Sequence, residues 1–250
     1  MLELTRSSFS RALRRHGLRG RVAAERSLLT EQNREARADF ARRQLHLHPD
    51  EEYWRTVIFT DEKTFDTSAH GRQIVYRADG TRFQPQHVAQ RQVSGRVTVH
   101  CWGWMDGQGR GSLYRLGPRF NADAYLELLR ERFLPEIRRL RQPPYRFQQD
   151  HSPVHTARRV RAMLEAEEDV ELVPWMPRGA DVSPIENMWG RMVDDLTPRL
   201  RERRTTADQL WEAAQDAWAR LSADYCRRLS ESVPRRLRAV IESEGGWTGY

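Results

Sequence analysis

Short runs of β-branched and aromatic residues alternate with amphipathic stretches along most of this chain, and this alternation limits its fold more than any other feature. We predict strands in six places, over residues 56–60, 73–77, 97–105, 112–116, 145–149 and 170–173. The segments 121–140 and 156–167 carry apolar residues at helical spacing. Strands that come first and then alternate with helices predict an α/β domain with a mixed sheet.

Capping and breaking residues place the ends of the helices. Asn121 is a candidate N-cap for the long helix, which ends before Pro143. A further helix starts near Pro184, because proline suits the first helical turn. Two more are predicted over residues 206–221 and 224–242.

Composition supports a folded core and a polyanionic partner. Eight Trp, eight Phe and seven Tyr argue against a disordered chain, and no apolar run is long enough to span a membrane. The net charge is +7, and Lys63 is the only lysine among 42 basic residues. Arginine presents a planar fork that matches phosphate. Codon bias explains the preference for Arg over Lys equally well, but it does not explain the net positive charge.

Three acidic residues stand out by position. Asp61 and Asp150 each end a predicted strand, and Glu186 lies in the first turn of a predicted helix. Residues at the carboxyl ends of neighbouring strands converge on one crevice. Carboxylates that converge repel one another unless cations lie between them, and oxygen ligands suit Mg²⁺ or Mn²⁺. Two such ions form the clamp used in phosphoryl displacement.

Each of these acids taken alone has an ordinary explanation. Most of the 35 acidic residues of such a chain are solvated or paired on the surface. Glu186 alone would be a carboxylate that stabilises a helix N-terminus. The local sequences around the three acids make the functional interpretation much stronger.

These local sequences resemble the catalytic blocks of the Tc1/mariner transposases, within the DDE superfamily. The three blocks are VIFTDEKTF (57–65), FQQDHSPVHTA (147–157) and PWMPRGADVSPIENMWG (174–190). Thirty-five residues separate Asp150 from Glu186, close to the usual family spacing. The loop sequence RGADVS (178–183) departs from the common family string, which affects only the expected loop geometry.

The resemblance implies an RNase H-like core, in which a mixed five-stranded sheet is flanked by helices. It implies that Asp61, Asp150 and Glu186 are the catalytic residues and ligands of two Mg²⁺ or Mn²⁺ ions. The implied reaction is cleavage of transposon-end DNA by water, followed by transfer of the 3′-hydroxyl into target DNA at TA sites. The implied partners are double-stranded terminal repeats and target DNA, with the enzyme a homodimer when DNA-bound and located in the nucleus.

Several neighbouring residues have weaker assignments. His151, His155 and Asn187 are candidate supporting residues, although the two histidines are expected mainly to shape the loop. Glu62 is expected to point to the opposite face of the strand from Asp61. Further expectations are that Trp189 anchors the catalytic helix in the core and that Asp181 is a loop or surface charge.

The amino-terminal segment is the most basic part of the chain. Residues 1–50 contain 11 Arg and six acids, with helices predicted over 5–15 and 30–43. The family resemblance implies two helix-turn-helix units before the core, and residues 6–18 look like the last recognition helix. We therefore expect residues 1–50 to be the remnant of a truncated DNA-binding region and 51–250 to be the catalytic domain. The arginines expected to contact DNA are Arg11, Arg14, Arg15, Arg19 and Arg21.

Two alternatives remain open at the level of sequence. A decayed or domesticated copy would bind DNA, or pair with a full-length enzyme, without cutting. A different RNase H-like nuclease would act on RNA–DNA hybrids, but the string PIENMW (184–189) argues against it. The intact triad favours an active enzyme.

Overall fold

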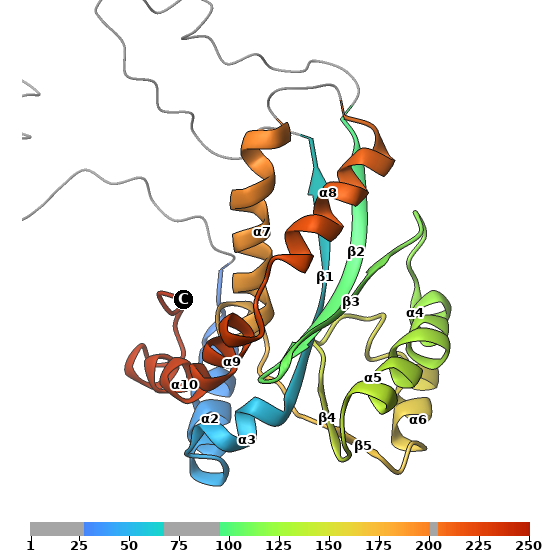
Figure 1. Ribbon diagram of the computed structural model, residues 1–250. Coiled ribbons are helices and arrows are strands. Elements are labelled where there is room, and N and C mark those ends of the chain that lie inside the picture. The colour runs from blue at the N-terminus through green and yellow to red at the C-terminus, as the bar shows by residue number, and fades with distance from the viewer. Residues whose placement is uncertain (1–27, 68–95, 201–204) are drawn as a thin grey trace, which may run out of the picture. The chain divides into compact units, whose positions relative to one another are not determined.

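The computed structural model describes residues 28–67, 96–200 and 205–250 (Figure 1). The chain divides into two compact units, Met1–Thr30 and Glu31–Tyr250, and the second unit contains the sheet. Three predictions lie outside the described residues: the helix over 5–15, the strand over 73–77, and the five candidate DNA-binding arginines between Arg11 and Arg21.

Five strands form one mixed sheet in the order β3–β2–β1–β4–β5. β1 pairs with β2 and β2 with β3 in antiparallel fashion, whereas the β1–β4 and β4–β5 pairs are parallel. The mixed five-stranded sheet that the family resemblance implies is therefore confirmed. The strands are β1 (Val57–Asp66), β2 (Thr98–Asp106), β3 (Gly109–Arg115), β4 (Tyr145–Gln148) and β5 (Val170–Leu172).

Helices cover both faces of this sheet (Figure 1). One face is covered by α4 (Ala122–Leu128), the π-helical segment η2 (Leu129–Phe133), α5 (Leu134–Leu140) and α6 (Arg158–Glu165). The other face is covered by α7 (Pro184–Leu200) and α8 (Ala207–Ala219). The remaining helical elements are α2 (Glu31–Leu47), α3 (Glu51–Thr56), the 3₁₀ turn η3 (Gly179–Asp181), α9 (Ala223–Glu231) and α10 (Val233–Glu242).

Strand alternation divides the buried apolar residues between two cores. Ile58 faces the core under α4 to α6, where Phe133 and Phe147 pack with ring centroids 5.1 Å apart. Its neighbour Phe59 faces the core under α7 and α8. In that core Trp189 and Trp218 stack at 5.2 Å. Adjacent residues of β1 therefore point to opposite faces of the sheet, one towards α4 to α6 and the next towards α7 and α8.

The predicted helix ends are partly confirmed. Asn121 caps α4, since its side-chain oxygen accepts hydrogen bonds from the backbone N–H groups of Asp123 and Ala124, both at 3.0 Å. The single helix predicted over residues 224–242 is wrong. It is two helices, α9 and α10, which meet at Ser232. Pro234 lies in the first turn of α10, where its missing N–H costs no helical hydrogen bond.

Helix α2 belongs to the same compact unit as the sheet. It packs against α10, and its Phe40 and Ala41 join the core under α7 and α8. The domain division predicted after residue 50 stays a prediction, and the unit that contains the sheet begins at Glu31.

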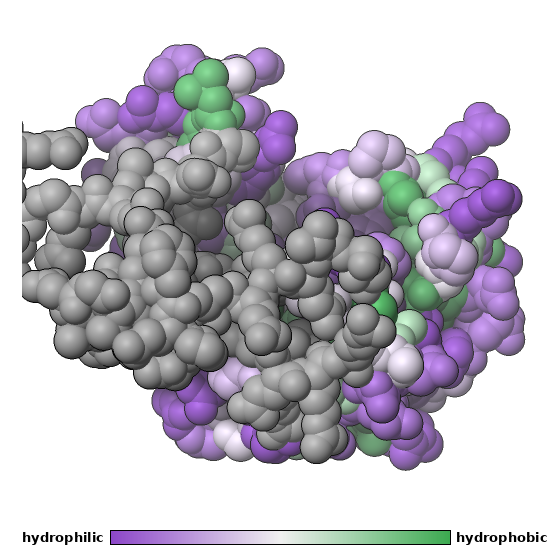
Figure 2. All heavy atoms as spheres, turned by 90° about the horizontal axis from the view of Figure 1, so that it is seen from above, coloured by the Kyte–Doolittle hydropathy of each residue, from purple (hydrophilic) through white to green (hydrophobic). Residues whose placement is uncertain are grey.

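The described surface is largely polar. Viewed along the direction of Figure 2, the described atoms are mostly hydrophilic, with small separate apolar areas. Within the described residues, the exposed large apolar side chains are Leu28, Leu47 and Leu140. None of the described helices has the length and apolar content needed to cross a lipid bilayer.

Candidate functional site at the end of the parallel strand pair

Asp61 and Asp150 lie at the same level of the sheet. The parallel pairing of β1 with β4 runs through Phe59 and Gln148, and each aspartate is two residues further along its own chain segment. The Thr60 hydroxyl donates to the Gln148 carbonyl at 2.9 Å and holds the two segments together at this point. The structure therefore brings both aspartates to the carboxyl end of the parallel pair.

The prediction that Asp61 ends its strand is wrong. β1 continues to Asp66 because its other edge pairs with β2, with Asp61 opposite Gly103. What ends before Asp61 is the pairing with β4, because β4 is only four residues long. The predicted position of Asp61 is still correct in one respect, because Asp61 lies just beyond the last residue of β1 that pairs with β4.

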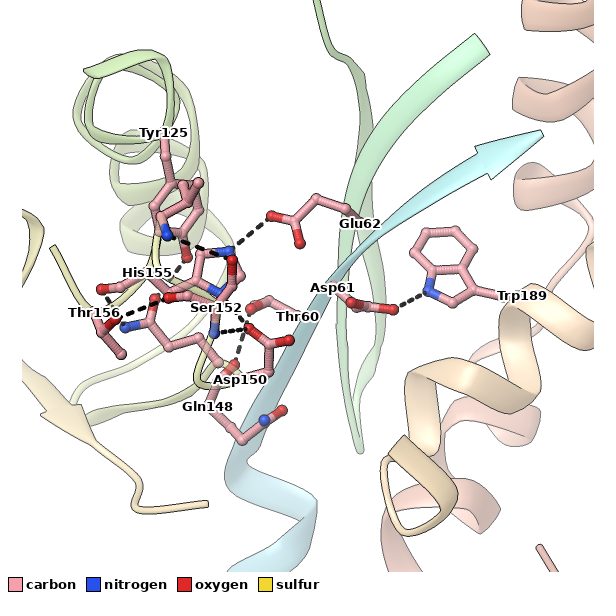
Figure 3. A network of polar contacts seen from close by, with 12 residues as sticks. Thr60, Asp61, Glu62, Tyr125, Gln148, Asp150, Ser152, His155, Thr156 and Trp189 are labelled. Carbon is pink, nitrogen blue, oxygen red and sulfur yellow. Dashed lines mark hydrogen bonds and ion pairs between the residues drawn. The ribbon is translucent and has the colours of Figure 1, made fainter. Parts of the chain in front are cut away.

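Asp61 is directed towards α7. The indole Nε1 of Trp189 donates to Asp61 Oδ2 at 2.9 Å, and the Trp189 ring itself is fully buried (Figure 3). Trp189 is therefore the core anchor that we expected, and in addition it fixes one carboxylate oxygen of Asp61. The Asp61 side chain is only partly exposed to solvent.

Glu186 lies in the first turn of α7 and acts on the same carboxylate through its charge. Burial, followed by repulsion from Glu186 and then from Glu62, raises the pKa of Asp61 to about 8, and the Trp189 hydrogen bond offsets only part of this. Two carboxylates that disfavour each other's charge in a partly buried position form an anionic centre. A divalent cation would relieve this repulsion.

Asp150 has a different environment, because it lies just beyond β4 and its side chain is 58% exposed. The Ser152 N–H donates to Asp150 Oδ1 at 2.8 Å, and His155 Nδ1 lies 2.6 Å from the same oxygen. The hydrogen bond with His155 lowers the pKa of Asp150 below its ordinary value, despite some burial. Among the described residues, no hydrogen bond reaches Oδ2, so this oxygen is available to a ligand.

His155 joins Asp150 to Glu62, a residue that the sequence analysis did not place at the site. His155 Nε2 lies 2.8 Å from Glu62 Oε1, and the His155 side chain is only 2% exposed (Figure 3). Burial alone would lower the pKa of His155, but its bonds to Asp150 and Glu62 outweigh burial and raise that pKa to about 9. Glu62 does point away from Asp61, as alternation predicted, yet it meets the site through this imidazole.

The other two candidate supporting residues each take part in a hydrogen bond with another segment of the chain. His151 Nε2 lies 2.8 Å from the Trp175 carbonyl and so ties the loop after β4 to the segment before η3. The backbone carbonyl of Asn187 accepts a hydrogen bond from the Tyr225 hydroxyl at 3.3 Å. These contacts support roles in shaping the site, which remain predictions.

The loop that leads to Glu186 is fixed by a buried ion pair. Arg37 on α2 and Asp181 in η3 are 2.8 Å apart, with side chains 0% and 1% exposed. Arg37 also donates to the carbonyls of Arg178 and Gly245, at 2.6 and 2.9 Å. The expectation that Asp181 is a loop or surface charge is wrong, because α2 and the C-terminal segment cover it.

The donor set fits a hard divalent cation. Asp61, Asp150 and Glu186 offer only carboxylate oxygens, the ligands that Mg²⁺ and Mn²⁺ prefer. Burial and the neighbouring carboxylates raise the pKa of Asp61, so a cation at this position would favour its charged form. Over the described ranges, no three His, Cys, Asp or Glu side chains are already gathered as a metal site. Three ligands around shared ions therefore stay a prediction.

Comparison with solved structures identifies the fold. The Mos1 transposase paired-end complex with left transposon end superposes with a TM-score of 0.81 at 21% identity, over 97% of this chain and 71% of that one. The crystal structure of the catalytic domain of Mos1 mariner transposase gives a TM-score of 0.63 at 20% identity, covering 90% and 99%. The fold is therefore α/β of the RNase H-like type, as expected.

Sequence relatives assign the family. The transposable element Tcb1 transposase of Caenorhabditis briggsae is 31% identical over 248 residues, which cover 98% of this chain and 88% of the relative. The Tc1 transposase of Caenorhabditis elegans is 28% identical over 96% of this chain and 86% of its own length. No family model matches the chain. The chain belongs to the Tc1/mariner family of transposases.

Proposed function

We propose that this protein is a DNA transposase that cleaves transposon-end DNA and transfers the freed 3′-hydroxyl into target DNA at TA sites. The observation that carries the proposal is the anionic centre of Asp61 and Glu186 beside Asp150, at the open end of the parallel strand pair. Relatives that cover nearly the whole chain are transposases, which supports the same reaction.

Asp61, Asp150 and Glu186 would hold two Mg²⁺ or Mn²⁺ ions. Bound there, such ions supply an activated water or 3′-hydroxyl and stabilise the leaving oxygen. Solved structures of the similar Mos1 transposase contain Mg or Mn, which supports use of a divalent metal. The protein's own part is to present oxygens: Trp189 fixes Asp61 Oδ2, and the bonds to Asp150 Oδ1 leave its Oδ2 available.

DNA is the proposed partner, with terminal repeats and target duplex both bound. Similar proteins have been solved as complexes with a transposon end, and the net charge of +7 favours phosphate contacts. We propose that Arg11, Arg14, Arg15, Arg19 and Arg21 contribute to this binding, that the DNA-bound form is a homodimer, and that the protein acts in the nucleus.

A cleavage assay on labelled duplex DNA tests the reaction. Nicking should require Mg²⁺ or Mn²⁺ and should stop in excess EDTA. It should fail with Ca²⁺, which favours looser, higher-coordinate geometry. Asp150→Asn should abolish nicking while the circular dichroism spectrum is unchanged, because the substitution removes charge but little volume. Undiminished cutting in EDTA, or by this variant, would exclude the proposed mechanism.

DNA binding is tested separately from cutting. For about 6–10 phosphate contacts, affinity should fall roughly 10³–10⁵-fold between 50 and 200 mM salt. A protein that binds DNA with this salt dependence but never cuts it, with either metal, would instead be the catalytically silent copy.

A further inference from the structure

We propose that Glu62 and His155 form a positioning pair that orients the Asp150 carboxylate for metal binding. The inference rests on the proposed function, because it concerns the metal that Asp150 would hold. His155 bridges the two carboxylates, 2.6 Å from Asp150 Oδ1 and 2.8 Å from Glu62 Oε1 (Figure 3). His155 and Glu62 themselves are 93 positions apart in the chain.

The imidazole is held on several sides. The ring of Tyr125 on α4 lies against it, with the two ring centroids 4.5 Å apart. The hydroxyl of Tyr125 donates to Gln149 Oε1 at 2.8 Å, so Tyr125 is itself fixed to the segment before Asp150. A buried ring that is bonded at both nitrogens and packed on a face cannot rotate without losing these contacts. The direction of its bond to Asp150 is therefore set by the fold.

This restraint has a chemical consequence for Asp150. Both hydrogen bonds to its carboxylate, from Ser152 and His155, end on Oδ1. Oδ2 is thus the oxygen presented to a ligand, although the side chain as a whole is more than half exposed. An exposed carboxylate without such partners would sample several rotamers and would lose entropy when it binds an ion. Partners behind a metal ligand typically change metal affinity 10–100-fold.

The contact with Glu62 distinguishes positioning of the Asp150 carboxylate from simple packing of the loop after β4. If His155 only shaped the loop after β4, its Nδ1 bond to Asp150 would suffice. The second bond extends across to β1, the strand that carries Asp61, and so couples the positions of the two aspartates. Glu62 has a side chain 28% exposed, so it can be changed without creating a cavity in the core.

Two variants of the full-length chain, Glu62→Gln and His155→Gln, test the inference. Mn²⁺ binding would be followed by electron paramagnetic resonance in the absence of DNA, and nicking would be measured across a range of Mn²⁺ concentrations. Positioning predicts that each variant weakens Mn²⁺ binding about 10–100-fold. Nicking at saturating Mn²⁺ should recover most of the parent rate. Glu165→Gln on α6, an exposed carboxylate paired with Arg161, is the matched control and should bind Mn²⁺ like the parent.

The two variants distinguish the effect of positioning on Mn²⁺ affinity from the effect of removing a negative charge. Loss of the Glu62 charge would weaken cation binding on electrostatic grounds alone. Loss of the His155 ring would not, since a neutral imidazole contributes no charge and a protonated one repels the metal. Weaker binding in both variants, with a less than additive double variant, supports a coupled pair.

Three results would overturn the inference. If His155→Gln has a folded circular dichroism spectrum and unchanged Mn²⁺ affinity, then Glu62 acts on Mn²⁺ only through its negative charge and not by positioning Asp150. A loss of nicking that saturating Mn²⁺ does not restore would show a role other than metal positioning. If the parent binds no Mn²⁺, or Asp150→Asn binds it equally well, the proposed function fails together with the inference.

Discussion

Two regions of the described chain hold charged groups away from solvent, and they are built in opposite ways. At the first, the Arg37 centre, Arg37 and Asp181 form a fully buried pair of opposite charges, and Arg37 also donates to the backbone carbonyls of Gly245 and Arg178. At the second, the carboxylate edge, burial and then repulsion from the like charge of Glu186 raise the pKa of Asp61. In the first region opposite charges lie against each other, whereas in the second burial and the neighbouring Glu186 disfavour the charged form of Asp61.

Because of this difference, we expect the Arg37 centre to contribute mainly to stability and the carboxylate edge to contribute mainly to activity. Two buried groups of opposite charge stabilise each other's ionised form. When one of them is removed, the other is left buried without a counter-charge. Like charges held together weaken the fold, and they persist only if the surrounding structure holds them in place. The Arg37 centre does part of that holding, because Asp181 lies in the turn that leads into α7 and Glu186. Substitutions in the two regions should therefore have opposite effects on activity and stability.

The largest expected effect is on activity at the carboxylate edge. Asp61→Asn should reduce metal-dependent nicking by roughly a thousandfold or more, which corresponds to about 4 kcal/mol in the barrier. In the absence of metal the same variant should unfold at a temperature equal to or above that of the parent, because it removes the repulsion from Glu186. Parallel cleavage assays and thermal unfolding would measure both. A variant that is inactive only because it is unstable would contradict the comparison.

The next effect is on stability at the Arg37 centre. Arg37→Met should lower the free energy of unfolding by about 3–5 kcal/mol, because Asp181 is then left buried and unpaired. Urea denaturation would measure this loss. The control is Arg42→Met, whose pair with Asp39 lies on the exposed face of the same helix at 2.8 Å. That variant should change stability by less than about 1 kcal/mol. Equal losses in the two variants would show that burial of the pair is not what matters.

A third effect is on the pH dependence of stability without metal. The pKa of Asp61 is about 8 in the folded chain against an ordinary value of 3.8, so the folded state binds the proton more tightly than the unfolded state. Its contribution therefore makes the fold less stable as the pH rises from about 4 to about 8. Asp61→Asn should flatten the profile of melting temperature in this range relative to the parent. Identical profiles would mean that Asp61 carries its charge at little cost.

The local pattern of the sequence was enough to predict much of the architecture. β-branched and aromatic runs form strands, and Asn121 and Pro184 mark helix starts, because these depend on residues close together in the chain. The placement of Asp61 and Asp150 together beyond the parallel strand pair also followed, because the carboxyl ends of parallel strands meet at one edge.

Contacts between distant segments were decided only in three dimensions. Arg37 and Asp181 are 144 positions apart, and Glu62 and His155 are 93 apart. Nothing in the residues near Asp181 distinguishes a buried carboxylate from a surface one, because its burial depends on α2 and the C-terminal segment that cover it. Likewise, alternation along β1 sets the face on which Glu62 lies, whereas only the path of the loop after β4 brings His155 to that face. Sequence determined which chemical groups are available, and the packing of distant segments decided which of them share an environment.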